Sequence, residues 1–230
     1  GLPHGVKHTY ERIPAHIYED EELACERLAE KLVESINAAP GIFRLGLSTG
    51  TSPVILYKEL VKRYKAGDVS FKNVEIYSTD EYYPAPADSQ SRNRRLYEEL
   101  IAQVDIKPEN VHVPKLTRTL DGMEVSEFCR KYDQMARGLD LLIMGMGEKG
   151  QVGFNENGVS EFSRTRTVLL PYGSRKRQAK NFVGNLDITP RSAIAIGVST
   201  MMTAKKIMLI GWGEDKAQVV KRIVEDKADS

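Results

Sequence analysis

The sequence predicts an α/β protein built on a single doubly wound, mostly parallel β-sheet with helices on both faces, a Rossmann-like arrangement. Short apolar runs alternate with longer amphipathic segments along the chain, and strands that are buried on both faces read as continuous apolar runs. With 230 residues, 41% of them hydrophobic, the chain is long enough to bury one core. No repeat, low-complexity tract or linker divides it. We therefore expect one domain over residues 1–230.

The expected elements alternate in order along the chain. Strands are expected where apolar runs are short: 13–18, 43–48, 74–79, 111–114, 140–147, 166–170, 193–199 and 206–212. Helices are expected where apolar residues recur at helical spacing: 19–39, 54–67, 92–104, 123–138 and 216–228. In open parallel sheets, ligands bind beyond the carboxyl ends of the strands. We therefore look for function in the loops 48–53, 80–91 and 145–158.

Charge and composition exclude several classes. Thirty-three basic and thirty-two acidic residues give a net charge of +1, so the basic excess typical of sequence-independent nucleic-acid binders is absent. No apolar run approaches the roughly 20 residues that a membrane span needs. The two cysteines cannot build a disulfide framework or a zinc site by themselves. We expect a cytoplasmic protein without nucleic-acid or membrane partners.

Two short motifs match well-known patterns, but neither has the surroundings that the corresponding chemistry requires. Residues 46–50 fit the nucleophile elbow G-x-S-x-G, but a serine hydrolase needs a later histidine, and only His112 follows. Residues 145–150 fit the dinucleotide pattern G-x-G-x-x-G, but the segment after them lacks the helical spacing that a pyrophosphate site requires. A small-residue turn and a glycine-rich active-site loop explain the two motifs better.

Polar side chains meet at the expected ligand edge of the sheet. The first loop offers hydroxyls, an unhindered glycine and a helix start, which suit a phosphoryl group; its members are Ser48, Thr49, Gly50, Thr51 and Ser52. The paired carboxylates Asp80 and Glu81 end the next core strand. They can also be read as a capping or solvated pair. Asn155 and Glu156 follow the glycine-rich loop that contains Gly147.

Four segments carry a resemblance to a known family: 45–60, 76–84, 145–166 and 193–217. In this order they resemble the signatures of the glucosamine-6-phosphate deaminase (isomerase) family, whose superfamily includes 6-phosphogluconolactonase. The start of the chain and the segment 80–84 are most similar to longer, two-domain members. We therefore expect a chain truncated at its C-terminus or a shortened relative.

The resemblance implies a role for each matching residue. Its implied phosphate ligands are Gly50, Thr51, Ser52, Arg175 and Lys216. Asp80 is implied as the base that moves a proton between carbons 2 and 1 of the open-chain sugar, and Glu156 assists ring opening. The remaining implied substrate contacts are Ser48, Thr49, Glu81, Gly147 and Asn155. The family needs no cofactor and no metal, and it implies a homo-oligomer whose ligand is a phosphorylated hexosamine or hexose.

The sequence departs from the family pattern in two loops. Lys149 and Gln151 replace an aspartate and the histidine that opens the sugar ring, and glutamine cannot shuttle a proton near neutral pH. Arg92 replaces an aromatic residue after Ser91. The basic run 92–95 could face an anionic ligand or nucleic acid, but we expect it to be a solvated helix face. The sequence therefore predicts sugar-phosphate binding with weak deamination of the cyclic substrate. A non-catalytic sensor and an enzyme for a different amino-sugar phosphate remain alternatives.

Overall fold

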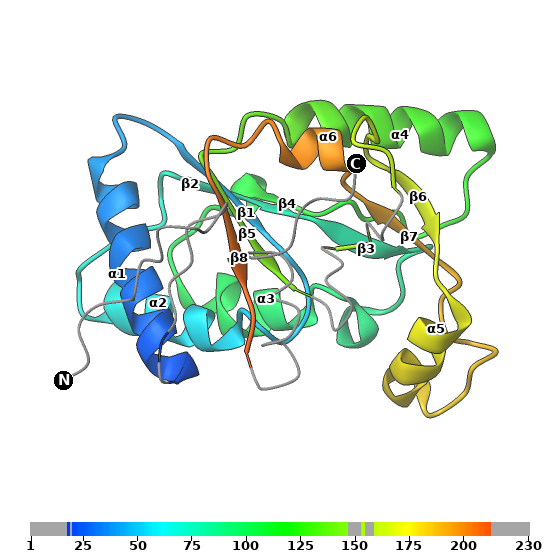
Figure 1. Ribbon diagram of the computed structural model, residues 1–230, viewed down its shortest axis with the longest axis horizontal. Coiled ribbons are helices and arrows are strands. Elements are labelled where there is room, and N and C mark those ends of the chain that lie inside the picture. The colour runs from blue at the N-terminus through cyan, green and yellow to red at the C-terminus, as the bar shows by residue number, and fades with distance from the viewer. Residues whose placement is uncertain (1–17, 19, 147–152, 155–158, 213–230) are drawn as a thin grey trace, which may run out of the picture.

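The computed structural model describes residue 18 and residues 20–146, 153–154 and 159–212. Its main sheet has five strands, which run parallel in the order β4-β2-β1-β5-β8. They are β1 (Phe43–Leu47), β2 (Val74–Ser78), β4 (Val111–His112), β5 (Leu141–Gly145) and β8 (Ile207–Ile210). The first strand lies in the middle, with crossovers on either side (Figure 1). The predicted α/β class with a mostly parallel sheet is confirmed.

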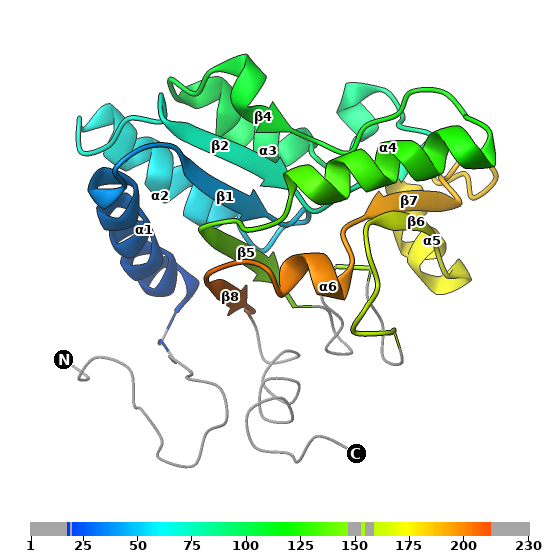
Figure 2. The ribbon, with the colours of Figure 1, turned by 90° about the horizontal axis from the view of Figure 1, so that it is seen from above.

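Helices cover both faces of this sheet, as the alternating pattern predicted. One face packs against α1 (Glu21–Ala38), α2 (Val54–Lys65) and α3 (Arg94–Glu99) around a large apolar cluster. The other face packs against α4 (Gly122–Met135) and the short α6 (Val198–Met201) around a smaller cluster. Figure 2 shows α4 on the opposite side of the sheet from α2. The core therefore lies on both sides of β1 and β5.

The starts of α1 and α4 follow local capping chemistry. The carboxylate of Asp20 accepts a hydrogen bond of 2.7 Å from Leu23 N at the start of α1. At the start of α4, Asp121 and Glu124 form a reciprocal capping box, which satisfies backbone donors that a helix leaves unpaired. In α1, the buried positions Cys25, Leu32 and Ile36 share the face that the apolar spacing predicted. These starts are therefore encoded locally.

A second sheet corrects two predictions. Its three antiparallel strands are β3 (Asp80–Tyr83), β7 (Ser192–Ala195) and β6 (Arg166–Leu169), in the order β3-β7-β6, and α5 (Tyr172–Gln178) follows β6. The expected single sheet is thus two sheets, and the segment expected to be a loop from residue 80 begins with a strand. Asp80 pairs with Ala195 in this register. A pairing partner more than a hundred residues away supplies these backbone hydrogen bonds, and local sequence does not reveal it.

Other boundaries differ by a few residues. The helix expected over 92–104 is α3, which starts at Arg94, followed by a 3-10 turn at Ile101–Gln103. Further 3-10 turns lie at Asp88–Gln90, Pro108–Asn110 and Ala179–Phe182. The expected strand at 13–18 lies almost wholly outside the described residues, and the expected helix at 216–228 lies entirely outside them. No helix in the described part of the chain is long and apolar enough to cross a membrane.

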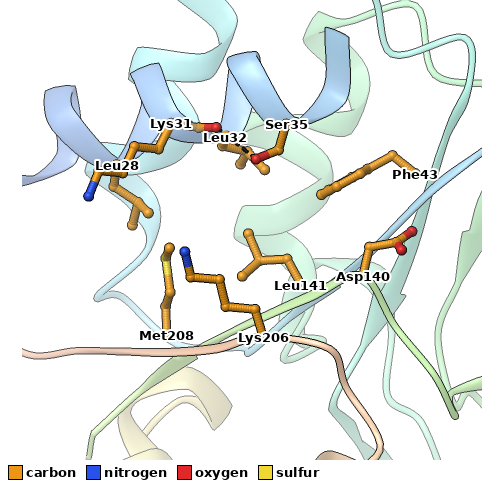
Figure 3. Close-up of a pocket in the computed structure, with 9 residues that line it drawn as sticks. All are labelled: Leu28, Lys31, Leu32, Ser35, Phe43, Asp140, Leu141, Lys206 and Met208. Atoms are coloured by element: carbon orange, nitrogen blue, oxygen red, sulfur yellow. Dashed lines mark hydrogen bonds between the residues drawn. The ribbon is translucent and has the colours of Figure 1, made fainter. Parts of the chain in front are cut away.

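A small hollow of about 70 Å³ lies between α1 and the sheet (Figure 3). Its lining includes Leu28 and Leu32 of α1, together with Phe43, Leu141 and Met208 at or near the starts of three strands. The amino ends of parallel strands are opposite the edge where ligands bind. The hollow is therefore separate from the expected site.

A buried carboxylate joins α4 to the second sheet and to α6. Asp133 accepts hydrogen bonds from Thr165 N (2.9 Å), Thr165 Oγ1 (2.8 Å) and Thr200 Oγ1 (2.5 Å), and Arg137 Nε donates to its other oxygen (2.8 Å). Burial alone would raise the pKa of Asp133, but these hydrogen bonds outweigh it and lower that pKa below its ordinary value. The ionised form is therefore the one that stabilises the fold.

We expect Asp133→Asn to lower the free energy of unfolding by about 2 kcal/mol at pH 7, because an uncharged amide cannot accept hydrogen bonds on both of its terminal atoms and leaves a buried donor unsatisfied. Since the folded-state pKa is lowered, the stabilisation is present above the unfolded value of about 4 and is lost as the pH falls below it. Urea denaturation from pH 7 to pH 3 should therefore show the two proteins converging in acid. The exposed Asp68→Asn is the control. A constant difference across this range would contradict the assignment.

Candidate functional site

The loop 48–53 leaves the carboxyl end of the central strand and is held by its neighbours. Ser48 N donates to Ile143 O (3.0 Å), and Ser48 Oγ accepts from Gly145 N (2.9 Å). Trp212 Nε1 donates to Ser52 O (2.8 Å). A Cβ on Gly145 would lie 3.4 Å from Ser52 Cβ, which is ordinary van der Waals contact, so this end of β5 lies directly against the loop. The loop is therefore a pre-formed turn between β1 and α2.

The tip of this loop is open to an anion. Gly50 and Thr51 are exposed, and Gly50 has a φ of +112°, which side-chain-bearing residues rarely adopt. At the start of α2, Pro53 occupies the N-cap position and no side chain caps the helix. The first backbone amides of a helix are unpaired donors at the positive end of its dipole. This arrangement can hold a phosphoryl group.

Asp80 lies directly beside this loop and is 1% exposed. Thr49 Oγ1 donates to its Oδ1 (2.7 Å), and Thr79 Oγ1 donates to its Oδ2 (2.9 Å). One hydrogen bond thus joins the predicted phosphate loop to the predicted base. The structure brings together two groups that lie thirty-one positions apart in the sequence.

Arg92 is the residue that our sequence analysis missed. Arg92 lies before the start of α3 and not on the solvated face of that helix. The Arg92 side chain is only 19% exposed. Its Nε donates to Asp80 Oδ1 in a close ion pair, and its Nη2 donates to Thr49 Oγ1 (2.8 Å). Its guanidinium carbon lies 4.4 Å from the ring centroid of Phe154 and 5.5 Å from that of Tyr82. The expectation of a solvated Arg92 was wrong.

The environment of Arg92 stabilises its charge. Burial by itself lowers the pKa of Arg92, but the charge and hydrogen bond of Asp80 together with the interactions of Tyr82 outweigh it, and the pKa is raised above its ordinary value. Two aromatic rings within about 6 Å add cation–π attraction. The departure from the family pattern at this position was the sequence signal that could have identified it.

Glu81 points away from Asp80 and shapes the turn that carries Arg92. It is fully buried, and its carboxylate accepts hydrogen bonds from Arg92 N (3.0 Å), Asn93 Nδ2 (3.0 Å), Tyr82 N (2.8 Å) and the Ser91 hydroxyl. Successive side chains of a strand face opposite sides. The two carboxylates therefore have different partners, and Glu81 anchors the turn 91–93.

Of the remaining predicted site residues, the structure describes Arg175 and not the others. Arg175, in α5, donates from Nη2 to Leu186 O (2.8 Å) and Thr189 O (3.4 Å), and within the described residues none of its hydrogen bonds reaches the loop 48–53. The others lie outside the described residues: Gly147, Lys149, Gln151, Asn155, Glu156 and Lys216. Phe154, which precedes Asn155, does reach Arg92.

Other chemistries find no support among the described residues. Among the described residues, the one histidine is His112. It lies in β4, two strands away from β1, and its ring stacks on that of Tyr77 with centroids 4.5 Å apart. Burial raises the pKa of Cys25 and Cys129 to about 11, so neither is a thiolate near neutral pH. No group of three potential metal ligands occurs in the described part of the chain.

Known proteins resemble this chain over most of its length. Residues 19–230 match the family described as glucosamine-6-phosphate isomerases/6-phosphogluconolactonase. Glucosamine-6-phosphate deaminase 2 of Bacillus subtilis is 35% identical over 214 residues, covering 91% of this chain and 84% of the relative. A glucosamine-6-phosphate deaminase-like protein of Bacteroides thetaiotaomicron is 38% identical over 222 residues, which are 94% of this chain but 33% of that protein.

Solved structures give the same result. A monomeric glucosamine-6-phosphate deaminase superposes with a TM-score of 0.82 at 27% identity, covering 92% of this chain and 87% of the other. The 6-phosphogluconolactonase of Thermotoga maritima has a TM-score of 0.68 at 19% identity, with coverages of 89% and 86%, and shares the fold. The chain belongs to the glucosamine-6-phosphate isomerase/6-phosphogluconolactonase family.

Proposed function

We propose that the chain binds a phosphorylated hexosamine or hexose in the manner of a glucosamine-6-phosphate deaminase. The observation that carries the proposal is the contact between the anion-ready loop and a buried carboxylate, through Thr49 and Asp80. The phosphoryl group is assigned to the backbone amides and hydroxyls of Gly50, Thr51 and Ser52. A sugar held there by its phosphate can extend toward Asp80.

The chemistry proposed for such a sugar is an aldose–ketose proton transfer. Asp80 would take the proton from carbon 2 of the open-chain sugar and return it to carbon 1, while water releases the amino group as ammonia. Glucosamine 6-phosphate and water would then give fructose 6-phosphate and ammonia. A general base must lie within hydrogen-bond reach of the proton that it takes, and the place of Asp80 beside the loop supports that role.

Ring opening is the step that we expect to be slow. Glu156 remains the proposed ring-side acid, with Gln151 and Lys149 standing where the family has histidine and aspartate. Lys216 remains a proposed phosphate cation. Arg175 can bind the phosphate only if its guanidinium gives up its hydrogen bonds to backbone carbonyls. A homo-oligomer also stays a prediction, and one solved relative is a monomer.

A second candidate function is a sugar-phosphate sensor without turnover. The ion pair between Arg92 and Asp80 favours it, because the carboxylate oxygen that faces the loop already accepts hydrogen bonds from Arg92 and Thr49. Ammonia release separates the two candidates. Binding of glucosamine 6-phosphate without ammonia would identify the sensor, and ammonia released from a different amino-sugar phosphate alone would identify a changed substrate.

Replacing Gly50 by alanine should weaken binding of glucosamine 6-phosphate by about tenfold or more, because the change strains the backbone that presents the amides. Isothermal titration calorimetry measures the effect. Gly41→Ala is the matched control, since a Cβ meets nothing within 4 Å at either position but Gly41 is not among the glycines with a positive φ. Unphosphorylated glucosamine should not bind detectably to either variant. Equal affinities of the wild type and Gly50→Ala would contradict the assigned phosphate site.

Restoring the family residues should restore ring opening. A variant that combines Gln151→His with Lys149→Asp should interconvert the two anomers of glucosamine 6-phosphate, through the open chain, about 10²-fold faster than the wild type, since a positioned acid–base typically contributes 10²–10⁴-fold. Exchange NMR between the anomeric proton signals gives the rate. Wild-type interconversion already as fast as that of the double variant would show that the two replacements do not limit ring opening.

A further inference from the structure

Arg92 binds the carboxylate oxygen of Asp80 that also contacts the loop 48–53. The Asp80 oxygen Oδ1 accepts from both Arg92 Nε and Thr49 Oγ1, and Oδ2 accepts from Thr79 Oγ1. Arg92 Nη2 also binds Thr49 Oγ1, so the guanidinium spans the gap between the loop and the carboxylate. Hydrogen bonds to an ionised group are roughly twice as strong as neutral ones. Both oxygens of the carboxylate are therefore occupied by protein donors.

The position of Arg92 is enforced from several sides. Its backbone N–H binds Glu81 Oε1, and Asn93, which is fully buried, binds the other oxygen of Glu81. The rings of Phe154 and Tyr82 lie close to the guanidinium. A side chain fixed by its backbone, by aromatic contacts and by an ion pair has little freedom to leave Asp80. Movement of the guanidinium away from Asp80 would break all of these contacts except those of the backbone.

We propose that Arg92 is a positioning residue that keeps Asp80 as an ion-pair partner and thereby suppresses its action as a base on the bound sugar. This inference rests on the proposed function, and it concerns a different step from ring opening. Proton transfer at carbon 2 needs an oxygen of Asp80 that can approach the C–H bond and accept its proton. With Arg92 in place, Asp80 instead contributes a fixed, neutralised pair to the wall of the sugar site.

An epoxide probe tests this inference without ring opening. A 1,2-anhydrohexitol 6-phosphate is an open-chain sugar phosphate with an epoxide across carbons 1 and 2. A free carboxylate oxygen attacks an epoxide carbon, the carbon–oxygen bond of the epoxide breaks, and the alkoxide takes a proton from water, leaving an ester on the protein. Intact mass spectrometry gives the labelling rate, and peptide mapping locates the ester. Calorimetry with glucosamine 6-phosphate reports binding separately.

We expect the wild type to bind glucosamine 6-phosphate but to be labelled slowly. Arg92→Gln should be labelled at Asp80 about 10- to 100-fold faster, the factor that a hydrogen bond to a charged group is worth, and Arg92→Lys should remain slow because it keeps the charge. The variant that combines Arg92→Gln with Asp80→Asn should not be labelled. Arg95→Gln, an exposed change three positions away, should behave like the wild type.

Arg92→Tyr repeats the test if Arg92→Gln fails to fold, because tyrosine keeps a large ring against Phe154. Labelling of the wild type as fast as that of the Arg92 variant overturns the inference. So does a folded, ligand-binding Arg92 variant that stays unlabelled, and in both cases the proposed phosphate binding stands. If the wild type binds neither glucosamine 6-phosphate nor the epoxide, the proposed function itself fails.

Discussion

Arg92→Leu will lower the free energy of unfolding by about 3 kcal/mol, because it leaves the buried carboxylate of Asp80 without its charged partner. Asp80 is 1% exposed, and among the described residues it would keep the hydroxyl hydrogen bonds of Thr49 and Thr79 alone. Asp80→Asn should cost less, since the Arg92 side chain is 19% exposed and its guanidinium can reach water. Chemical denaturation at pH 7 gives both values.

The double variant decides whether the two residues act as a pair. When Asp80→Asn is already present, Arg92→Leu should cost about 1 kcal/mol, so the two single changes should be strongly non-additive. Arg95→Leu, at an exposed position of α3, is the control and should change stability by no more than about 0.5 kcal/mol. Additive costs of the two single changes would show that the ion pair does not contribute to stability.

Gly197→Ala is expected to lower the free energy of unfolding by about 3 kcal/mol or more, because the added methyl group has no space. A Cβ at Gly197 would lie 2.0 Å from Ser163 O and 2.6 Å from Arg164 C, and these are backbone atoms. The segment cannot simply move away, since Ser199 N donates to Ser163 O (3.0 Å) and Val198 N donates to Ser163 Oγ (3.0 Å). The backbone of Gly197 has a φ of −85°, which any residue adopts, so the cost is steric.

Thermal and urea unfolding measure this cost, and Gly41→Ala provides the comparison. A Cβ at Gly41 meets nothing within 4 Å, so that change should alter stability by no more than about 0.5 kcal/mol. If Gly197→Ala unfolds at the same urea concentration as Gly41→Ala, the close approach of the segments around Ser163 and Gly197 does not hold in solution.

Local patterns in the sequence determined the layout of the chain. Apolar runs predicted the core strands and amphipathic spacing predicted helices such as Glu21–Ala38, because burial and helical periodicity are properties of consecutive residues. The loop from Ser48 to Ser52 was also predicted to follow the first core strand of the sheet, and it does. Its position could be predicted because the strand, the small polar residues and the helix start are consecutive in the sequence, while phosphate binding there stays a prediction.

Only the tertiary structure decided how distant side chains meet. The pairing of β3 with β7 turned an expected loop into a strand, and the alternation along that strand sent Asp80 and Glu81 in opposite directions. The turn held by Glu81 then carried Arg92 onto Asp80, where we had expected a solvated side chain. These outcomes depend on contacts between segments far apart along the chain, which the propensities of neighbouring residues do not encode.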